Sequence, residues 1–248
     1  MKNLKYLTIS ILPLMWSVYF LFEILTGRVT DLPTILGNIA LIILFALVGF
    51  YFYKLSQKYP QGFKCKTIII IFSILMVIDQ GIKLVIKFFF FEDYIDIIKG
   101  FLSFNPIINT DGSWLNARFG TGISFPLLIF VNFIAILLFF ELYRYYLSKR
   151  NNSFYGDMCF LFIFSGSLCS LIDKIFYGGS LDFIGISNLF IADIKDIYIN
   201  LGILFFIISI VISGYLTEDD NTSFKEDLAS IKRFLIFSKN DIVSLFKK

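Results

Sequence analysis

Long apolar runs are the feature that most limits how this chain can fold. Each run can cross a hydrocarbon layer about 30 Å thick as one helix, and a helix satisfies its own backbone hydrogen bonds in lipid. A soluble domain of 248 residues would also need more polar surface than a sequence that is 57% hydrophobic provides. We therefore predict an all-α membrane protein with six transmembrane helices. The predicted helices lie at about residues 7–26, 33–53, 67–91, 121–143, 155–177 and 192–216.

The first apolar run follows Lys2 and Lys5, an arrangement that cleaved signal peptides also show. The run is long, however, and Thr26-Gly27-Arg28 follows it in place of a small-x-small cleavage site. We therefore expect it to be retained as the first transmembrane helix.

Basic residues near the helix ends predict the orientation in the membrane. They gather in two loops, between the second and third and between the fourth and fifth runs, and in the C-terminal tail. These residues are Lys54, Lys58, Lys64, Lys66, Arg144, Lys149, Arg150, Lys225, Lys232, Arg233, Lys239, Lys247 and Lys248. Cytoplasmic loops are enriched in lysine and arginine. We predict a multi-pass protein of the cytoplasmic (inner) membrane with both termini in the cytoplasm.

This orientation leaves two notable segments on the extracytoplasmic side of the membrane. Residues 92–120 are long and mixed in character, and residues 178–191 are short and begin with two glycines. We expect a small extracytoplasmic part that contains β-strands, with a short interfacial helix over 92–98 as the alternative. The tail, 217–248, has apolar residues at helical spacing between basic ones, which predicts an amphipathic helix on the cytoplasmic membrane surface.

The composition excludes several kinds of chemistry. Histidine is absent, which removes Ser-His-Asp and Cys-His catalysis and most zinc sites. The three cysteines, Cys65, Cys159 and Cys169, show no metal or redox spacing. The basic residues form no stripe that would bind nucleic acid. We expect no metal, no cofactor and no nucleic-acid partner.

Charged side chains inside the apolar runs are costly and need a reason. Asp79 and Lys83 are four residues apart in the third run, so they share a helix face and can pair. A structural ion pair inside the helix bundle is one explanation, and a functional site is the other.

Three aspartates converge where the fifth and sixth runs meet the outer face. Asp173 lies near the end of the fifth run, Asp182 in the short external segment, and Asp193 at the start of the sixth run. Two close carboxyl groups share a proton, so one can activate water while the other donates to a carbonyl oxygen. Peptide hydrolysis by paired acids fits this pattern. Asp193 alone is equally typical of a helix N-cap.

The order of these motifs resembles the signal peptidase II family, the lipoprotein signal peptidases of bacteria. The motifs that carry the resemblance are Asp79-Gln80-x-x-Lys83, Asn109-Thr110-Asp111-Gly112-Ser113-Trp114, Gly166-Ser167-Leu168-x-x-Leu171-Ile172-Asp173-Lys174, Gly178-Gly179-Ser180-Leu181-Asp182-Phe183 and Ala192-Asp193. The resemblance covers about residues 67–216, which corresponds to the family's four-helix core. Residues 1–66 then form a two-helix N-terminal membrane extension, and 217–248 a basic cytoplasmic tail.

The resemblance implies an aspartic endopeptidase without a cofactor. Such an enzyme removes the signal peptide of a diacylglyceryl-modified prolipoprotein, just before the lipid-bearing cysteine. By position, Asp182 and Asp193 would be catalytic at the outer face. Supporting roles would fall to Asp79, Lys83, Asp173 and Lys174, and substrate contacts to Asn109, Gly112 and Ser170. Membrane lipid surrounds the chain, and the two added helices could contact a further membrane partner.

The chain departs from the family pattern at several supporting positions. Ser170 stands where the family has asparagine, Lys174 where it has arginine, Ser180 where it has valine, and Phe190 where it has asparagine. Lysine cannot replace the bidentate fork of arginine. These departures motivate a second hypothesis, a noncatalytic relative that binds lipidated peptides or a partner complex. A third hypothesis is a small transporter that uses Asp79 as an ion site.

Overall fold

The computed structural model describes residues 2–111, 114–120, 122–149, 151–213 and 224–245. In this part of the chain, six helices are long and apolar enough to cross a membrane, which confirms the predicted fold class. They are α1 (Lys2–Leu25), α2 (Leu32–Lys58), α3 (Cys65–Val85) with its π-helical extension η1 (Ile86–Phe90), α5 (Phe125–Ser148), α6 (Phe154–Phe176) and α7 (Ile194–Ile212).

Several predicted helix boundaries differ from the structure by two to five residues, and two of the start positions have a clear backbone reason. The fourth helix begins at Phe125, not at residue 121, because Gly122 has a positive φ of 67° that an ongoing helix does not allow. A proline at the start of this helix then favours helical geometry. The sixth helix begins at Ile194, not at residue 192, because Asp193 has extended backbone and acts as its N-cap.

Helix α6 is the centre of the bundle, with most of its side chains buried. It packs against α3, α5 and α7. Glycines permit its close approach to α7: a Cβ added at Gly166 would lie 2.8 Å from the side chain of Ile199, and one at Gly202 would collide with Ile163. Small residues at such crossings let membrane helices gain packing contacts without a hydrophobic driving force.

The outer surfaces of the helices are strongly apolar. Large apolar side chains such as Leu47 on α2, Val77 on α3 and Phe130 on α5 are more than half exposed. In water, an apolar surface of this extent would drive association. In a bilayer it meets lipid tails, which agrees with the multi-pass membrane assignment.

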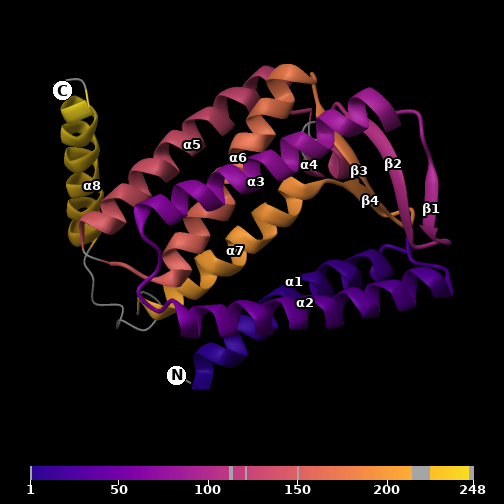
Figure 1. Cartoon of the computed structure of the whole chain (residues 1–248), viewed down its shortest axis with the longest axis horizontal. Helices are drawn as coiled ribbons and strands as arrows, with labels where there is room; N and C mark the ends of the chain where they lie inside the picture. Colours follow the sequence, from indigo (N-terminus) through magenta and orange to yellow (C-terminus); the bar gives the residue numbers. More distant parts are fainter. Residues whose placement is uncertain (1, 112–113, 121, 150, 214–223, 246–248) are drawn as a thin grey trace.

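A four-stranded antiparallel sheet lies at one end of the bundle, and both ends of the chain lie toward the opposite end (Figure 1). Its strands follow the order β1 (Ile95–Ile98), β2 (Leu102–Asn109), β3 (Ser180–Ile186) and β4 (Phe190–Ala192). The β-containing segment is therefore confirmed. The alternative helix over 92–98 is wrong, because Ile95 and Asp96 pair with β2. A short helix, α4 (Trp114–Phe119), follows β2.

The N-terminal hairpin of α1 and α2 is joined to the sheet by specific contacts. Arg28, between the two helices, donates to the carbonyl oxygens of Asn188 (2.9 Å) and Leu189 (2.6 Å) in the β3–β4 turn. The hydroxyl of Thr34, near the start of α2, donates to Ser187 of the same turn at 2.8 Å. The hairpin thus holds the turn that leads into α7.

The described part of the C-terminal tail forms the predicted helix, α8 (Phe224–Leu245). It contacts the end of α5, where Arg144 pairs with Asp241 at 2.8 Å and Tyr145 packs against Phe234 and Phe237. Leucine and isoleucine side chains along α8 remain exposed. Residues 217–223 and 246–248 lie outside the described residues.

Candidate active site

Helix α3 brings a lysine into the middle of several acids. The Nζ atom of Lys83 lies 3.1 Å from Asp79 Oδ2, 2.6 Å from Asp173 Oδ2 and 2.5 Å from Asp193 Oδ2. All four side chains are fully buried. A buried charge is tolerated only when it is paired and hydrogen-bonded. Lys83 therefore links three elements, α3, the end of α6 and the start of α7, through one ammonium group.

The amide of Gln80 strengthens the link between α3 and α6. Its Nε2 donates to Asp79 Oδ2 at 2.9 Å and to Asp173 Oδ1 at 3.0 Å. The predicted Asp79-Gln80-x-x-Lys83 motif is thus a connected hydrogen-bonding unit, in which both polar neighbours of Asp79 also contact Asp173. This arrangement fixes where the carboxylate of Asp173 lies.

The sheet supplies the next acid. Asp182 lies on β3, opposite Ile107 of β2, and its Oδ2 accepts a hydrogen bond of 2.9 Å from Asn109 Nδ2. Ser180, two residues earlier, lies on the same face of β3 and donates to Asp182 Oδ1. Antiparallel pairing of β2 and β3 therefore brings the distant Asn109 to the carboxyl group of Asp182.

Asp193 combines two tasks that looked like alternatives in the sequence. Its Oδ1 accepts from the backbone N–H of Asp196, and the side chain of Asp196 accepts in return from the N–H of Asp193, which completes a capping box. Its other oxygen, Oδ2, faces the ammonium groups of Lys83 and Lys195. Asp193 is the helix N-cap and a member of the buried cluster at once.

The three carboxyl groups at the sheet edge are close together. One oxygen each of Asp182, Asp193 and Asp196 lie within 4.8 Å of one another. Asp182 is 3% exposed and Asp193 is 0% exposed. Asp182 and Asp193 therefore have the proximity and the dry surroundings that a carboxyl pair needs to share protons.

The two acids have opposite electrostatic surroundings. Burial raises the pKa of Asp182 and the charge of Asp193 adds to that effect, while the Lys195 ammonium and the hydrogen bonds from Ser180 and Asn109 oppose it. Burial also favours the protonated form of Asp193, but the ammonium groups of Lys195 and Lys83 outweigh it and lower the pKa of that carboxyl. A pair whose pKa values are pushed apart in this way has one natural acid and one natural base.

Comparison with known proteins shows the family of the chain. The sequence model of the family described as signal peptidase (SPase) II matches residues 70–212, more than half of the chain. This chain belongs to the signal peptidase II family. Family membership identifies it as a membrane peptidase, a hydrolase, and supports lipoprotein signal peptidase function over the transporter hypothesis. No curated protein matches the chain.

Two solved structures of a bacterial membrane enzyme, determined by the in meso method, are similar to this chain. The structure at 2.3 Å resolution has 20% sequence identity and a TM-score of 0.51, and the match covers 66% of this chain and 99% of that one. The structure at 1.9 Å has 21% identity and a TM-score of 0.49, with coverage of 65% and 98%. The first of these likenesses shows that the fold is shared.

Most site residues expected from the resemblance to signal peptidase II come together. The structure places Asp79, Lys83, Asp173, Asp182 and Asp193 in one buried cluster, which we call the acid cluster, and Asn109 contacts it through Asp182. Their proximity is observed, and their roles stay predictions.

Two other expected site residues contact each other, and a third lies outside the described residues. Lys174 donates to Ser170 at 2.6 Å along the same face of α6, so these two residues bond to each other. Gly112 lies outside the described residues.

Two departures from the signal peptidase II pattern have structural explanations. Phe190, in place of asparagine, packs against Trp16 and Tyr19 of α1 with ring centroids 6.0 and 5.6 Å apart. The aromatic side chain therefore belongs to the contact with the added N-terminal helices. Ser180, in place of valine, provides a hydroxyl that contacts Asp182 and Lys195.

Lys195 is a further member of the site, and none of the sequence motifs includes it. Its ammonium contacts Asp193, Ser180, Asp173 (3.3 Å) and Asp182 (3.7 Å), and the residue is 5% exposed. One signal was available: a lysine in the first turn of a helix opposes the helix dipole and needs a compensating partner.

Two members of the acid cluster, together with Asp196, have the donor atoms for a cation. Asp182, Asp193 and Asp196 offer carboxylate oxygens at suitable mutual distances. The ammonium groups of Lys83 and Lys195 already lie against Asp193, so the positive charge that carboxylates require is supplied by the chain. We assign no metal ligands here.

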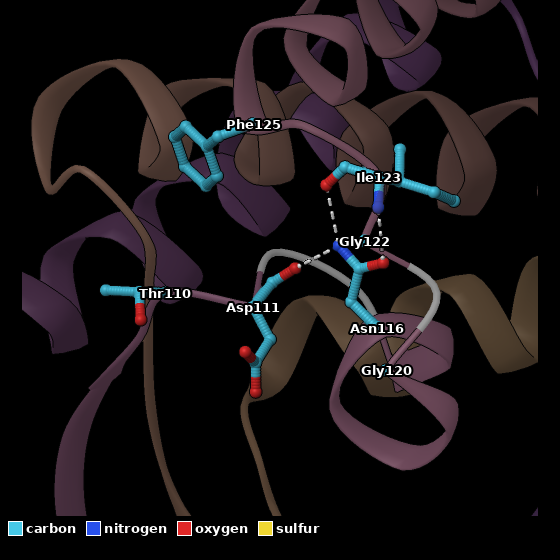
Figure 2. A pocket seen from close by; sticks show the side chains of 7 residues that line it. All are labelled: Thr110, Asp111, Asn116, Gly120, Gly122, Ile123 and Phe125. Carbon is cyan, nitrogen blue, oxygen red and sulfur yellow. Dashed lines mark hydrogen bonds between the residues drawn. The ribbon is translucent and has the colours of Figure 1, made fainter.

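A cavity of about 340 Å³ lies between the end of β2 and the start of α5. Figure 2 shows Thr110, Asp111, Ile123 and Phe125 around it. Asn116 joins the two sides of this loop, since its Nδ2 donates to the carbonyl oxygens of Asp111 and Ile123, both at 2.9 Å. The described residues that line the cavity include Thr110, which follows Asn109 in the sequence, but no member of the acid cluster.

Proposed function

We propose that this protein is an aspartic endopeptidase that removes signal peptides from diacylglyceryl-modified prolipoproteins, before the lipidated cysteine. The observation that carries the proposal is the Asp182–Asp193 pair, buried, within 4.8 Å, and held in opposite electrostatic surroundings. Family membership supports the substrate class. We refer to Asp182 and Asp193 as the dyad.

In the proposed first step, the Asp193 carboxylate takes a proton from a water molecule as the water oxygen attacks the scissile carbonyl carbon. The protonated carboxyl of Asp182 gives its proton to the carbonyl oxygen. The product is a neutral gem-diol, and no covalent bond to the enzyme forms. General acid and base catalysis of this kind contributes about 10²–10⁴-fold each to rate.

In the second step, Asp193 returns its proton to the leaving amide nitrogen, and Asp182 takes a proton from a gem-diol hydroxyl as the C–N bond breaks. Each carboxyl group then has the protonation state with which it began. Asn109 supports Asp182 throughout by its hydrogen bond to Oδ2.

We further propose a bacterial inner-membrane location with both termini in the cytoplasm and the dyad at the outer face. The basic loops and tail support this orientation. The sheet that bears Asp182 lies at the end of the bundle away from both chain ends (Figure 1), as the proposed orientation requires.

Purified full-length protein in detergent is expected to cleave a diacylglyceryl-modified prolipoprotein, and Asp182→Asn is expected to lower kcat at least about 10²-fold, because the amide cannot donate a carboxyl proton. The measurement is the mass loss of the signal peptide over time. The unmodified prolipoprotein serves as the substrate control.

Two outcomes of this assay would contradict the proposal. Full activity of Asp182→Asn would remove that residue from the chemistry. A folded wild type that binds the lipidated substrate without cleaving it, under conditions in which another family member is active, would favour the noncatalytic relative.

The rate of cleavage is expected to show a bell-shaped dependence on pH. Asp193 must be ionised, so the rate falls at low pH, below its lowered pKa. Asp182 must be protonated, so the rate falls at high pH, above its raised pKa. Initial rates at saturating substrate, measured over a range of pH, report both the acidic and the alkaline limb of this profile. A rate that rises steadily with pH to the alkaline end would show that no protonated carboxyl is needed.

A further inference from the structure

Lys195 occupies a position that is unfavourable for a lysine on two grounds. It lies in the first turn of α7, where the helix dipole disfavours a cation. It is also 5% exposed, and a buried ammonium loses its hydration. Specific contacts must offset the unfavourable helix dipole and the loss of hydration, and these contacts indicate the role of Lys195.

The contacts of Lys195 place its ammonium between the two dyad acids. Its Nζ donates to Asp193 Oδ2 and to Ser180 Oγ, and lies 3.7 Å from Asp182 Oδ1. Ser180 in turn donates to Asp182 Oδ1. A chain of direct contacts therefore runs from Asp193 through Lys195 and Ser180 to Asp182.

The two acids differ in how many ammonium groups lie near them. Asp193 Oδ2 is in contact with two ammonium groups, those of Lys83 (2.5 Å) and Lys195. Among the described residues, Asp182 has Lys195 as its one ammonium partner, at the longer distance of 3.7 Å, and its other oxygen accepts from the neutral amide of Asn109. Negative charge is therefore stabilised more strongly on Asp193 than on Asp182.

We propose that Lys195 sets the charge state of the dyad: its ammonium, fixed by Ser180 between the two acids, keeps Asp193 ionised as the base and leaves the dyad proton on Asp182. This inference rests on the proposed function for its consequence in catalysis, but the charge state itself can be measured without substrate. Lys195 is a positioning residue, because it acts through the two acids.

Other charged or titratable groups also face the dyad. They are Asp79 and Lys83 on α3, Asp173 and Lys174 on α6, and Asp196 and Tyr198 on α7. All of them remain when Lys195 alone is replaced. A change in the protonation of Asp193 in a Lys195 variant therefore reports the loss of this one ammonium.

The test is an infrared titration of the protonated-carboxyl band in the full-length protein in detergent. The component lost in Asp193→Asn is expected to titrate at lower pH than the component lost in Asp182→Asn. In Lys195→Met, the Asp193 component is expected to move up by about 1–3 pH units, the range for loss of an adjacent opposite charge. Lys195→Arg keeps the charge and should leave the order of the two components unchanged.

Lys87→Met is the matched control. Lys87 lies in η1, the extension of α3, and places its ammonium over the Tyr177 ring, 4.6 Å from the centroid. Its removal takes away one lysine without touching the dyad contacts, so the Asp193 component should stay in place.

Three results would overturn the inference: an unchanged Asp193 component in Lys195→Met, an equal change in Lys87→Met, or an Asp193 component that titrates above that of Asp182 in the otherwise wild-type protein. The comparison of the Asp193 and Asp182 components needs no Lys195 variant, so it tests the inference even if Lys195→Met fails to fold.

Cleavage provides an independent second measurement. Lys195 favours the ionised form of both acids, so Lys195→Met should move both limbs of the pH–rate bell to higher pH, and Lys195→Arg should restore them. If the wild type is active and both limbs of the pH–rate profile stay in place in Lys195→Met, the inference is overturned and the proposed function is not. Absence of cleavage in the wild type would instead count against the proposed function, and the infrared result would still decide the inference.

Discussion

Asp193→Asn is expected to lower kcat for prolipoprotein cleavage by about 10³-fold or more, because an amide cannot accept the proton of the attacking water. Asparagine is the informative replacement at this position. Asp193 is also the N-cap of α7, and asparagine caps helices about as well as aspartate. The variant therefore keeps the start of α7 and removes the base. The measurement is single-turnover cleavage followed by mass spectrometry.

Asp96→Asn is the control for this prediction. Asp96 belongs to β1 of the same sheet and is exposed, with a hydrogen bond to the Tyr94 hydroxyl, so its loss should leave the rate of cleavage close to that of the wild type. Near-normal turnover by Asp193→Asn, with unchanged helix content and thermal stability, would exclude Asp193 as the base and with it the proposed mechanism.

Lys83→Met is expected to lower the free energy of unfolding by about 3–5 kcal/mol, the usual cost of removing one partner from a buried ion pair. Lys83 is fully buried and contacts Asp79, Asp173 and Asp193. Without it, these carboxyl groups lose a shared cation in a dry site. Thermal and denaturant unfolding in a fixed detergent measure the loss, with Lys87→Met as the exposed-lysine control.

A double variant sharpens this prediction. Asp79 has Lys83 as its ion-pair partner on the same helix face, so adding Asp79→Asn to Lys83→Met removes one uncompensated carboxylate. The double variant should be more stable than Lys83→Met alone. If Lys83→Met is as stable as the wild type, the acid cluster does not depend on this lysine for its folding.

The contacts of the added N-terminal helices with the sheet indicate the structural role of these helices. Arg28 binds two carbonyl groups of the β3–β4 turn, and Phe190, at the end of that turn, packs against α1. Asp193 follows three residues later. The helices therefore help to hold the segment that carries one of the dyad acids, and the departure of Phe190 from the family pattern is part of this contact.

Local sequence patterns were sufficient for the membrane-spanning helices. Lipid forces each apolar run to close its own hydrogen bonds, so run length alone predicts a helix. Boundaries were less certain, because Gly122 and Asp193 end or begin a helix through backbone conformation that hydrophobicity does not show. The pairing of Asp79 with Lys83 also followed from spacing along one helix.

The sequence by itself determined the fold class and the identity of the dyad candidates, because helix formation in lipid and motif order are properties read along the chain. Only the tertiary structure decided which side chains from distant parts of the chain come into contact. The pairing of β2 with β3 brings Asn109 to Asp182, and the close approach of α6 and α7 at Gly166 brings Lys195 to Asp173. Such contacts join residues far apart in sequence, and their charges act through distances that only the folded chain fixes.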